Sequence, residues 1–316
     1  MSKNICIEFN KVSKKYKELL ALDNISFTIN KGEVFGYIGP NGAGKTTTIK
    51  ILIGLITDFN GEVYIYGKNI QKDTRDLHKL IGYHPQEAGF QEWRTVDHAF
   101  KTFGRLSGLS SDYIENRTQE ILRLIGLKDF RYKKITHLSG GMVQKLRLGQ
   151  ALLHEPEILV MDEPLSGLDP QMRFQFKEII KELAKSGITI LFSSHILSDV
   201  QDIADTIGIL NKGQIMKIGT PEELQTNFHI GNTLEIILAE NSPLYNRLEE
   251  ISGVDSVENI NSNKQLIHLE SEVDIDSIIS KILNKLLESK CLIRSFSLLK
   301  PSLEKVYLKY VGGNSE

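Results

Sequence analysis

Apolar and polar residues largely alternate near the start of the chain. Residues 5–10 (ICIEFN) and 22–29 (LDNISFTI) show the period of two that is typical of half-buried antiparallel strands. Residues 34–39 (VFGYIG) are apolar almost throughout, as expected for a strand covered on both faces in a layered α/β sheet. The pattern therefore predicts N-terminal antiparallel strands followed by a buried central strand.

Similar buried runs recur at residues 157–164 (EILVMDEP) and 187–195 (GITILFSSH), and each is separated from the next by a segment of helix length. This alternation predicts parallel strands joined by crossover helices. Residues from about 90 to 137 show helical patterns alone. They indicate a helical subdomain inserted in the α/β core.

The composition changes after Thr226, where the chain passes through FHIGN. From there the predicted order is strand, helix, strand, strand, helix and strand, which is the order of a ferredoxin-like sandwich, followed by a last helix. We therefore expect an α/β domain over residues 1–228 and a small α+β domain over residues 229–316. The long helix at 273–289 is expected to bury one apolar stripe, made of Ile275, Ile278, Ile279, Ile282, Leu283, Leu286 and Leu287.

The charge balance of the 316 residues is close to neutral, with 38 Lys and Arg against 40 Asp and Glu. This argues against a general binder of nucleic acids or anionic membranes, which would carry a basic excess. The only cysteines, Cys6 and Cys291, form neither a disulfide framework nor a zinc motif, and a reduced cytoplasmic compartment fits them best. No apolar run approaches the roughly 18 residues of a membrane-spanning helix, and the N-terminus does not have the apolar core of a secretion signal.

The strongest local motif is GPNGAGKT, from Gly39 to Thr46, which fits the phosphate-binding pattern GxxxxGK[ST]. Its glycines let backbone N–H groups turn toward a pyrophosphate, and the start of the next helix adds a positive dipole. Lys45 can then reach the terminal phosphates, while the hydroxyl of Thr46 can ligate Mg²⁺. The loop lies between a predicted buried strand and a helix, as this chemistry requires.

A second motif, ILVMDE, ends a buried strand in two carboxylates. Together with the phosphate loop, it assigns Asp162 to the metal and Glu163 to the proton of the attacking water. A third motif, LSGGM at 138–142, begins a helix and forms another anion-binding corner. Taken alone it is a helix cap and a turn, but it stands 162 − 139 = 23 residues before the metal-binding aspartate.

These motifs together make the chain resemble the nucleotide-binding subunits of ATP-binding cassette (ABC) transporters. The resemblance covers residues 1 to about 226 and runs through six motifs in order: GPNGAGKTT, GYHPQE with Gln86, LSGGM, ILVMDEP, SGLD with Asp169, and SSH with His195. It implies an ABC cassette with the P-loop NTPase fold, comprising a mixed sheet core, a helical subdomain and N-terminal antiparallel strands.

The resemblance also implies ATP hydrolysis with Mg²⁺, and it assigns a role to each matching residue. Glu163, His195 and Gln86 would be catalytic, and Thr46, Gln86 and Asp162 would hold the metal. Tyr16 would stack on adenine, whereas Ser139 and Gly141 would act in trans on the ATP of a second cassette. The nucleotide-binding set that it implies is Tyr16, Gly39, Asn41, Gly42, Gly44, Lys45, Thr46, Thr47, Ser139, Gly140, Gly141 and Asp169.

One departure from the family pattern concerns the signature, which ends in Met142 where the family usually has Gln. Met142 cannot donate hydrogen bonds as an amide does, but the serine and the glycines are intact. We therefore expect catalysis to survive. A GTPase is not indicated, because neither NKGQ at 211–214 nor NKQL at 263–266 fits the guanine-reading motif NKxD.

A single phosphate loop and a single signature imply pairing with a second cassette, as a homodimer or with a related chain. The resemblance further implies a separate membrane permease, which would hold the chain on the inner face of the cell membrane near Phe90, Trp93 and Arg94. Trp93 is equally well interpreted as a core residue of the helical subdomain. The alternative function is a soluble cassette ATPase acting on ribosomes or nucleic acid.

The cassette and its C-terminal tail (PSLEKVYLKYV) look like those of bacterial exporters of the drug or antibiotic-resistance kind. The tail could equally serve in dimerisation or regulation. The transported substrate is not encoded in this chain, because the permease selects it. The direction of transport rests on the resemblance.

Overall fold

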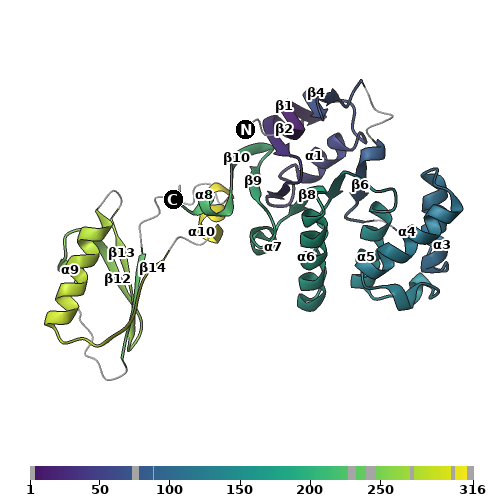
Figure 1. Cartoon of the computed structure of the whole chain (residues 1–316). Helices are drawn as coiled ribbons and strands as arrows, with labels where there is room; N and C mark the ends of the chain where they lie inside the picture. The colour runs from purple at the N-terminus through teal and green to yellow at the C-terminus, as the bar shows by residue number, and fades with distance from the viewer. Residues whose placement is uncertain are drawn as a thin grey trace. The chain divides into compact units, whose positions relative to one another are not determined.

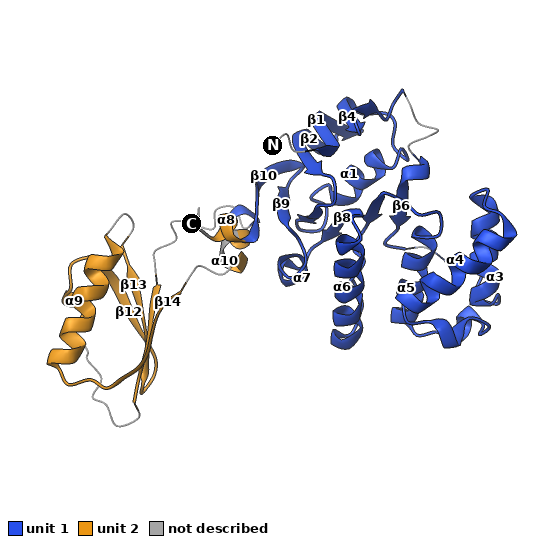
Figure 2. Cartoon of the chain, viewed as in Figure 1, with its two compact units in different colours: residues 1–221, 310–316 blue, residues 222–309 orange. Residues whose placement is uncertain are grey.

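The computed structural model describes residues 4–72, 78–87, 89–226, 233–239, 247–270, 274–299 and 303–311. The chain forms two compact units, which Figure 2 distinguishes by colour. Unit 1 comprises residues 1–221 and 310–316, and unit 2 comprises residues 222–309. The domain boundary expected between residues 228 and 229 lies outside the described residues, and it stays a prediction.

Unit 1 contains two sheets. The first is antiparallel, in the order β2-β1-β4-β5, and the second is mixed, in the order β10-β9-β3-β8-β7-β6. In the second sheet all neighbouring strands run parallel except β10, which pairs antiparallel with β9. The strands are β1 (Ile5–Tyr16), β2 (Leu19–Asn30), β3 (Val34–Ile38), β4 (Asn60–Ile65), β5 (Lys68–Asn69), β6 (Ile81–His84), β7 (Ile158–Met161), β8 (Thr189–Ser194), β9 (Thr206–Asn211) and β10 (Gln214–Gly219).

The helices of unit 1 connect the parallel strands or form a separate group. Helices α3, α4 and α5 lie together, while α1, α6 and α7 lie beside the strands (Figure 1). Their bounds are α1 (Lys45–Leu52), α3 (Val96–Leu106), α4 (Ser111–Leu124), α5 (Gly140–Ala151), α6 (Pro170–Lys185) and α7 (Leu197–Gln201). Two 3₁₀ helices, Lys128–Phe130 and Ile135–His137, complete the segment between α4 and α5. Helix α8 (Pro221–Thr226) follows β10, and all of it but Pro221 belongs to unit 2.

The core of unit 1 lies between the two sheets and includes α1. All five residues of β3 are buried, which confirms the prediction of a central strand. The rings of Phe9 and Phe27 stack with their centroids 4.5 Å apart, and Phe27 stacks on Phe35 of β3 at 5.3 Å. Such pairs add to the free energy gained by burying apolar area. They hold β3, and the loop that follows it, against the antiparallel sheet.

Unit 2 contains a four-stranded antiparallel sheet in the order β12-β13-β11-β14. Most of the predicted order is present, but the predicted first helix is described only as a 3₁₀ turn at Leu248–Glu250, and residues 240–246 lie outside the described part. The bounds are β11 (Thr233–Leu238), β12 (Val254–Asn261), β13 (Lys264–Leu269), α9 (Ile275–Glu288), β14 (Ile293–Leu299) and α10 (Leu303–Val311).

Helix α9 packs on this sheet through a narrower stripe than the sequence predicts. Ile278, Ile282 and Leu286 are buried, whereas Leu287 is 64% exposed, so its predicted place in the buried stripe is wrong. Consecutive helical residues point about 100° apart, so Leu286 and Leu287 cannot both face the centre of one sheet.

Within the described residues, no helix is both long and apolar enough to cross a membrane.

Candidate functional site

The phosphate loop joins β3 to α1 and passes close to neighbouring backbone. A Cβ on Gly39 would lie 2.3 Å from the carbonyl oxygen of Leu210, and one on Gly44 would lie 2.6 Å from that of Ala21. Gly44 also has a φ of +112°, a backbone conformation that residues other than glycine rarely adopt. These two glycines are therefore required by the packing of the loop.

The loop forms one wall of a pocket of about 390 Å³. This pocket brings together residues that are far apart in the sequence, namely the aromatic residue of β1, the loop, the glutamine after β6 and the second carboxylate after β7. Its lining is Tyr16, Leu19, Ala21, Asn41, Gly42, Ala43, Gly44, Lys45, Thr46, Thr47, Gln86 and Glu163. Nine of the sequence-predicted site residues thus share one cavity, which is large enough for a small-molecule ligand.

Lys45 begins α1, and its side chain is buried. Its Nζ donates hydrogen bonds to the carbonyl oxygens of Gly39 at 2.7 Å and Pro40 at 3.2 Å. The same Nζ lies 3.4 Å from Oε1 of Glu163. A buried ammonium needs such partners, because desolvation disfavours an isolated charge. Its position places a positive charge and a carboxylate side by side at the loop.

The two carboxylates at the end of β7 occupy different environments. Asp162 is almost completely buried, and its Oδ1 accepts a hydrogen bond of 2.7 Å from the hydroxyl of Ser193. The same hydroxyl accepts a bond of 2.9 Å from the backbone N–H of Glu163. Glu163 has a φ of +49°, in the left-handed region that a non-glycine residue adopts at a cost. Ser193 therefore stabilises the turn that points Asp162 and Glu163 to different places.

Ser193 is a site residue that the sequence analysis did not single out. It stands two residues before His195 on the buried strand β8, inside the SSH motif. The only sign of it in the sequence was a hydroxyl side chain near the end of a predicted buried strand. Only the pairing of β7 with β8 shows which carboxylate it contacts.

His195 lies beside Glu163, with 2.5 Å between its Nδ1 and Oε2 of the carboxylate. Each oxygen of Glu163 thus has a different partner, the lysine on one side and the histidine on the other. The carboxylate is positioned by two contacts that arise from two other motifs. Such a carboxylate can act as a general base toward a water at the phosphate loop.

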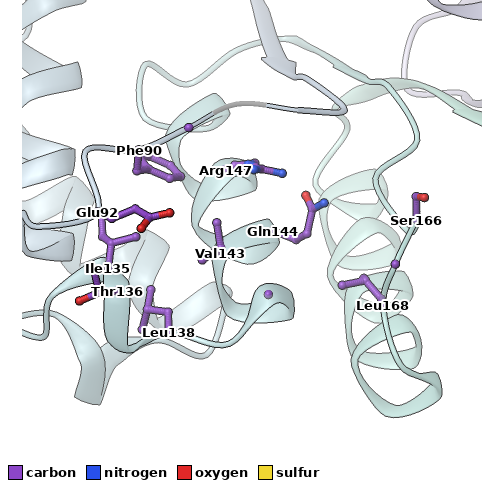
Figure 3. A pocket seen from close by; sticks show the side chains of 13 residues that line it. Phe90, Glu92, Ile135, Thr136, Leu138, Val143, Gln144, Arg147, Ser166 and Leu168 are labelled. Atoms are coloured by element: carbon purple, nitrogen blue, oxygen red, sulfur yellow. The ribbon is translucent and has the colours of Figure 1, made fainter.

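Gln86 is exposed after β6, and its backbone carbonyl oxygen accepts a hydrogen bond of 3.4 Å from the guanidinium of Arg147 on α5. Arg147 and Gln144 also line a second pocket, of about 350 Å³. Figure 3 shows their side chains with Phe90 and Glu92 on one side of the pocket and Ser166 on the other. This pocket is therefore lined by the segment after Gln86, by the signature LSGG with the first turns of α5, and by the segment after ILVMDEP.

The signature residues do not line the pocket at the phosphate loop. Ser139 is exposed and caps α5, because its hydroxyl accepts a bond of 3.3 Å from the backbone N–H of Met142. A Cβ on Gly141 would lie 2.7 Å from Cε of Met172, so this glycine lets α5 approach α6. Asp169 caps α6 by accepting a bond of 2.8 Å from the N–H of Met172. For Ser139, Gly141 and Asp169 the structure thus shows capping and packing contacts.

His84, the last residue of β6, was also missed from the sequence. It is completely buried, its Nε2 contacts the carbonyl oxygen of Gln144 at 3.3 Å, and its own carbonyl accepts a 2.9 Å bond from the N–H of Asp162. Its ring meets Phe176 edge to face at 5.9 Å. His84 therefore ties the signature helix α5 to the strand that carries Asp162. Burial lowers the pKa of His84 to about 4.

A pH-dependent stability follows from this buried histidine. The unfolded chain binds a proton on His84 below its ordinary pKa of about 6.5, and the folded chain does so only near pH 4. The free energy of unfolding is therefore expected to fall by up to roughly 3 kcal/mol as the pH drops through this window. Urea unfolding of the wild type and of His84→Leu, each at pH 7.5 and at pH 5, measures this change in the free energy of unfolding. The variant should lose part of the pH dependence, and equal dependence in both proteins would contradict the assignment.

Trp93 lies just before α3 and is 66% exposed, so the interpretation of this residue as part of a core is wrong. The guanidinium of Arg94 lies 4.8 Å from the centre of its ring. The same guanidinium contacts His98 at 3.1 Å and Thr102 at 3.2 Å, both on α3. The indole is thus held on the surface by a cation that is itself fixed to a helix.

Comparison with known proteins gives matches over most of the chain. A family model described as ABC transporter matches residues 22–166, and one described as ATP-binding protein DrrA1-3-like, C-terminal domain, matches residues 219–311. The linearmycin resistance ATP-binding protein LnrL of Bacillus subtilis (strain 168) is 30% identical over 311 residues, which cover 97% of this chain and 98% of that protein. The bacitracin transport ATP-binding protein BcrA of Bacillus licheniformis is 29% identical over 313 residues, 98% of either chain.

Among solved structures, a dimeric ATP-binding cassette bound to ADP and phosphate after hydrolysis matches with a TM-score of 0.61 and 25% identity. The match covers 68% of this chain and 98% of that one.

Proposed function

Because the chain belongs to the ATP-binding proteins of ABC transporters, we propose that it hydrolyses ATP at the phosphate loop and thereby drives export through a separate membrane permease. The observation that carries this proposal is the position of Glu163. Its Oε1 lies 3.4 Å from Nζ of Lys45, at the loop where the terminal phosphate of ATP would be held. A base, a phosphate-binding lysine and a buried carboxylate are the groups that phosphoryl transfer to water requires.

In the proposed reaction the loop N–H groups and Lys45 bind the phosphates and balance their charge. Glu163 accepts a proton from the attacking water, and His195 keeps the carboxylate oriented through its contact with Oε2. The gain in rate comes mainly from positioning and from neutralising charge. The contacts of Glu163 with two motifs support this division of roles.

The residues assigned to Mg²⁺ fit this metal by their chemistry. Thr46 offers a hydroxyl, Gln86 an amide oxygen and Asp162 a carboxylate, and Mg²⁺ prefers such hard oxygen ligands. Thr46 and Gln86 line the pocket, and Asp162 precedes the pocket residue Glu163 in the chain and accepts a hydrogen bond from Ser193. When bound, the ion neutralises charge on the phosphates.

A second cassette is proposed to complete each ATP site. Ser139 and Gly141 stand at the start of α5 and do not line the phosphate-loop pocket of their own chain, so they are proposed to act on the nucleotide of another. One of the matching solved structures is a cassette dimer. We propose a homodimer with two ATP molecules between its subunits, and Asp169 at the same interface.

Export is proposed because relatives that span nearly the whole chain are named for resistance to, or transport of, linearmycin and bacitracin. The match of residues 219–311 to a DrrA-like C-terminal domain supports the same group. The permease is proposed to dock at the exposed Trp93 and its neighbours Phe90 and Arg94. The chain would then act on the cytoplasmic face of the membrane.

Co-purification from detergent-solubilised membranes tests this proposal. The tagged chain should bring down a polytopic membrane protein, and Trp93→Ala should lose most of it because the exposed indole supplies a large contact area. Leu106→Ala is the matched control, since Leu106 is an apolar residue at the end of α3 that is even more exposed than Trp93. Thermal unfolding checks that both variants fold. Recovery of ribosomes or nucleic acid in place of a membrane protein would contradict the proposed function.

A further inference from the structure

We propose that Lys14 positions the ring of Tyr16 as the platform for the adenine base, and thus determines how much of the ATP affinity depends on the base. This rests on the proposed function, because Tyr16 has this role only if the pocket binds ATP. Lys14 belongs to none of the motifs that identify the site. Its importance appears only in the contacts of its side chain.

The position of Tyr16 leaves its ring with little support from its own strand. Tyr16 is the last residue of β1 and pairs with Leu19 across a two-residue turn. Its side chain is 42% exposed and lines the pocket with the phosphate loop. The end of a hairpin is where a backbone ladder frays most readily. A ring at that place needs an additional contact if it is to present one face to a ligand.

Lys14 supplies that contact from within the protein. It is only 7% exposed, and its Nζ lies 5.0 Å from the centre of the Tyr16 ring. The ammonium donates hydrogen bonds to the backbone oxygen of Asp58 at 2.5 Å and to its carboxylate at 3.0 Å. The carboxylate itself is fully exposed, so solvent screens its attraction. The backbone oxygen and the buried stem of the lysine are therefore the main anchors.

The arrangement has a direct chemical consequence for a bound base. A cation near one face of an aromatic ring is attracted by its quadrupole, and more strongly when the cation is shielded from water. In the proposed arrangement the ammonium of Lys14 contacts one face of the Tyr16 ring, and a base stacks on the opposite face. Stacking of a base on an aromatic side chain contributes measurably to affinity. Lys14 thus acts on the nucleotide through Tyr16.

The neighbouring Lys15 offers a matched control. Its side chain is 59% exposed, and its contact with Glu18 is 3.9 Å long. Lys14→Met and Lys15→Met remove the same charge from adjacent positions of β1. Only the first removes a cation from the ring of Tyr16.

The test measures binding of ATP and of inorganic triphosphate to the full-length chain by calorimetry. Lys14→Met should weaken ATP binding about fivefold, within the range of a partly shielded cation–π contact, and leave triphosphate binding unchanged. Lys14→Arg should restore most of the affinity, and Lys15→Met should match the wild type. Triphosphate has no base, so its unchanged affinity also shows that the variant is folded.

A double-mutant cycle with Tyr16→Ala separates positioning from a general effect of charge. In the Tyr16→Ala background, Lys14→Met should have almost no further effect on ATP binding. Equal loss of ATP and triphosphate binding, no loss at all, or the same loss with and without the ring would overturn the proposal. A wild-type chain that does not bind ATP would instead contradict the proposed function, and the present inference with it.

Discussion

Replacing Glu163 with Gln is expected to slow ATP hydrolysis by roughly 100- to 10,000-fold, the usual contribution of a positioned general base. The amide has nearly the same shape but cannot accept the proton of the attacking water. It also loses the ionic contact with Nζ of Lys45 at 3.4 Å, and it replaces the carboxylate oxygen that lies 2.5 Å from Nδ1 of His195. ATP binding should persist, since the loop and Lys45 are unchanged. ATP-bound dimers should therefore accumulate.

Phosphate release measures the rate, and size-exclusion chromatography with ATP measures the dimer. Glu157→Gln is the matched control, because Glu157 precedes the same strand at its other end and contacts Lys31 at 3.9 Å. It should hydrolyse ATP at nearly the wild-type rate. Normal turnover of Glu163→Gln would show that the base is another residue. Absence of an ATP-dependent dimer would contradict the proposed pairing of two cassettes.

Replacing Lys45 with Met should weaken ATP binding roughly 10- to 100-fold, the range expected for losing a charge-assisted hydrogen bond. The buried ammonium spans the loop, from the carbonyl of Gly39 at 2.7 Å to Glu163 at 3.4 Å. Methionine fills a similar volume without the charge, and it leaves Glu163 with one fewer cation at the site. The rate of hydrolysis should fall more than the affinity for ATP. The reason is that Lys45 would also neutralise the negative charge that develops on the phosphate oxygens in the transition state, and methionine cannot.

Lys50→Met controls for the loss of a positive charge from the same helix. Lys50 is exposed in the last turn of α1, away from the loop. Calorimetry should find its ATP affinity equal to that of the wild type. If Lys45→Met bound ATP as tightly as this control, the loop would not be the phosphate site.

The sequence was informative wherever chemistry depends on short spacing along the chain. GPNGAGKT predicted a loop between a buried strand and a helix, and the structure has that loop between β3 and α1. It was less informative where a contact joins distant segments. Ser193 contacts Asp162 and the backbone of Glu163 only because β7 and β8 are neighbours in the sheet.

Exposure was also decided by the tertiary structure. Leu287 belongs to an apolar run that predicts a buried stripe, but the sheet of unit 2 covers only the narrower face with Ile278, Ile282 and Leu286. Trp93 had two interpretations from the sequence, and its exposed position leaves only the surface one. Periodicity determines which residues share a face, whereas the width of the partner surface determines how many of them are covered.

The sequence by itself determined the type of chemistry, because a phosphate loop, a carboxylate-ended strand and a signature require particular residue types at fixed spacing. Tertiary structure alone decided which partners orient those residues. His84 between Asp162 and α5, and Ser193 at the turn of Glu163, contact segments far away in the sequence. Lys14 stands only two residues before Tyr16 on β1, but the anchor of its ammonium at Asp58 is also a long-range contact. These contacts exist because folding brings residues between 30 and 162 − 84 = 78 positions apart within hydrogen-bond distance. Hydrogen bonds weaken steeply when distance or angle departs from the ideal, so these contacts depend on the packing of the fold.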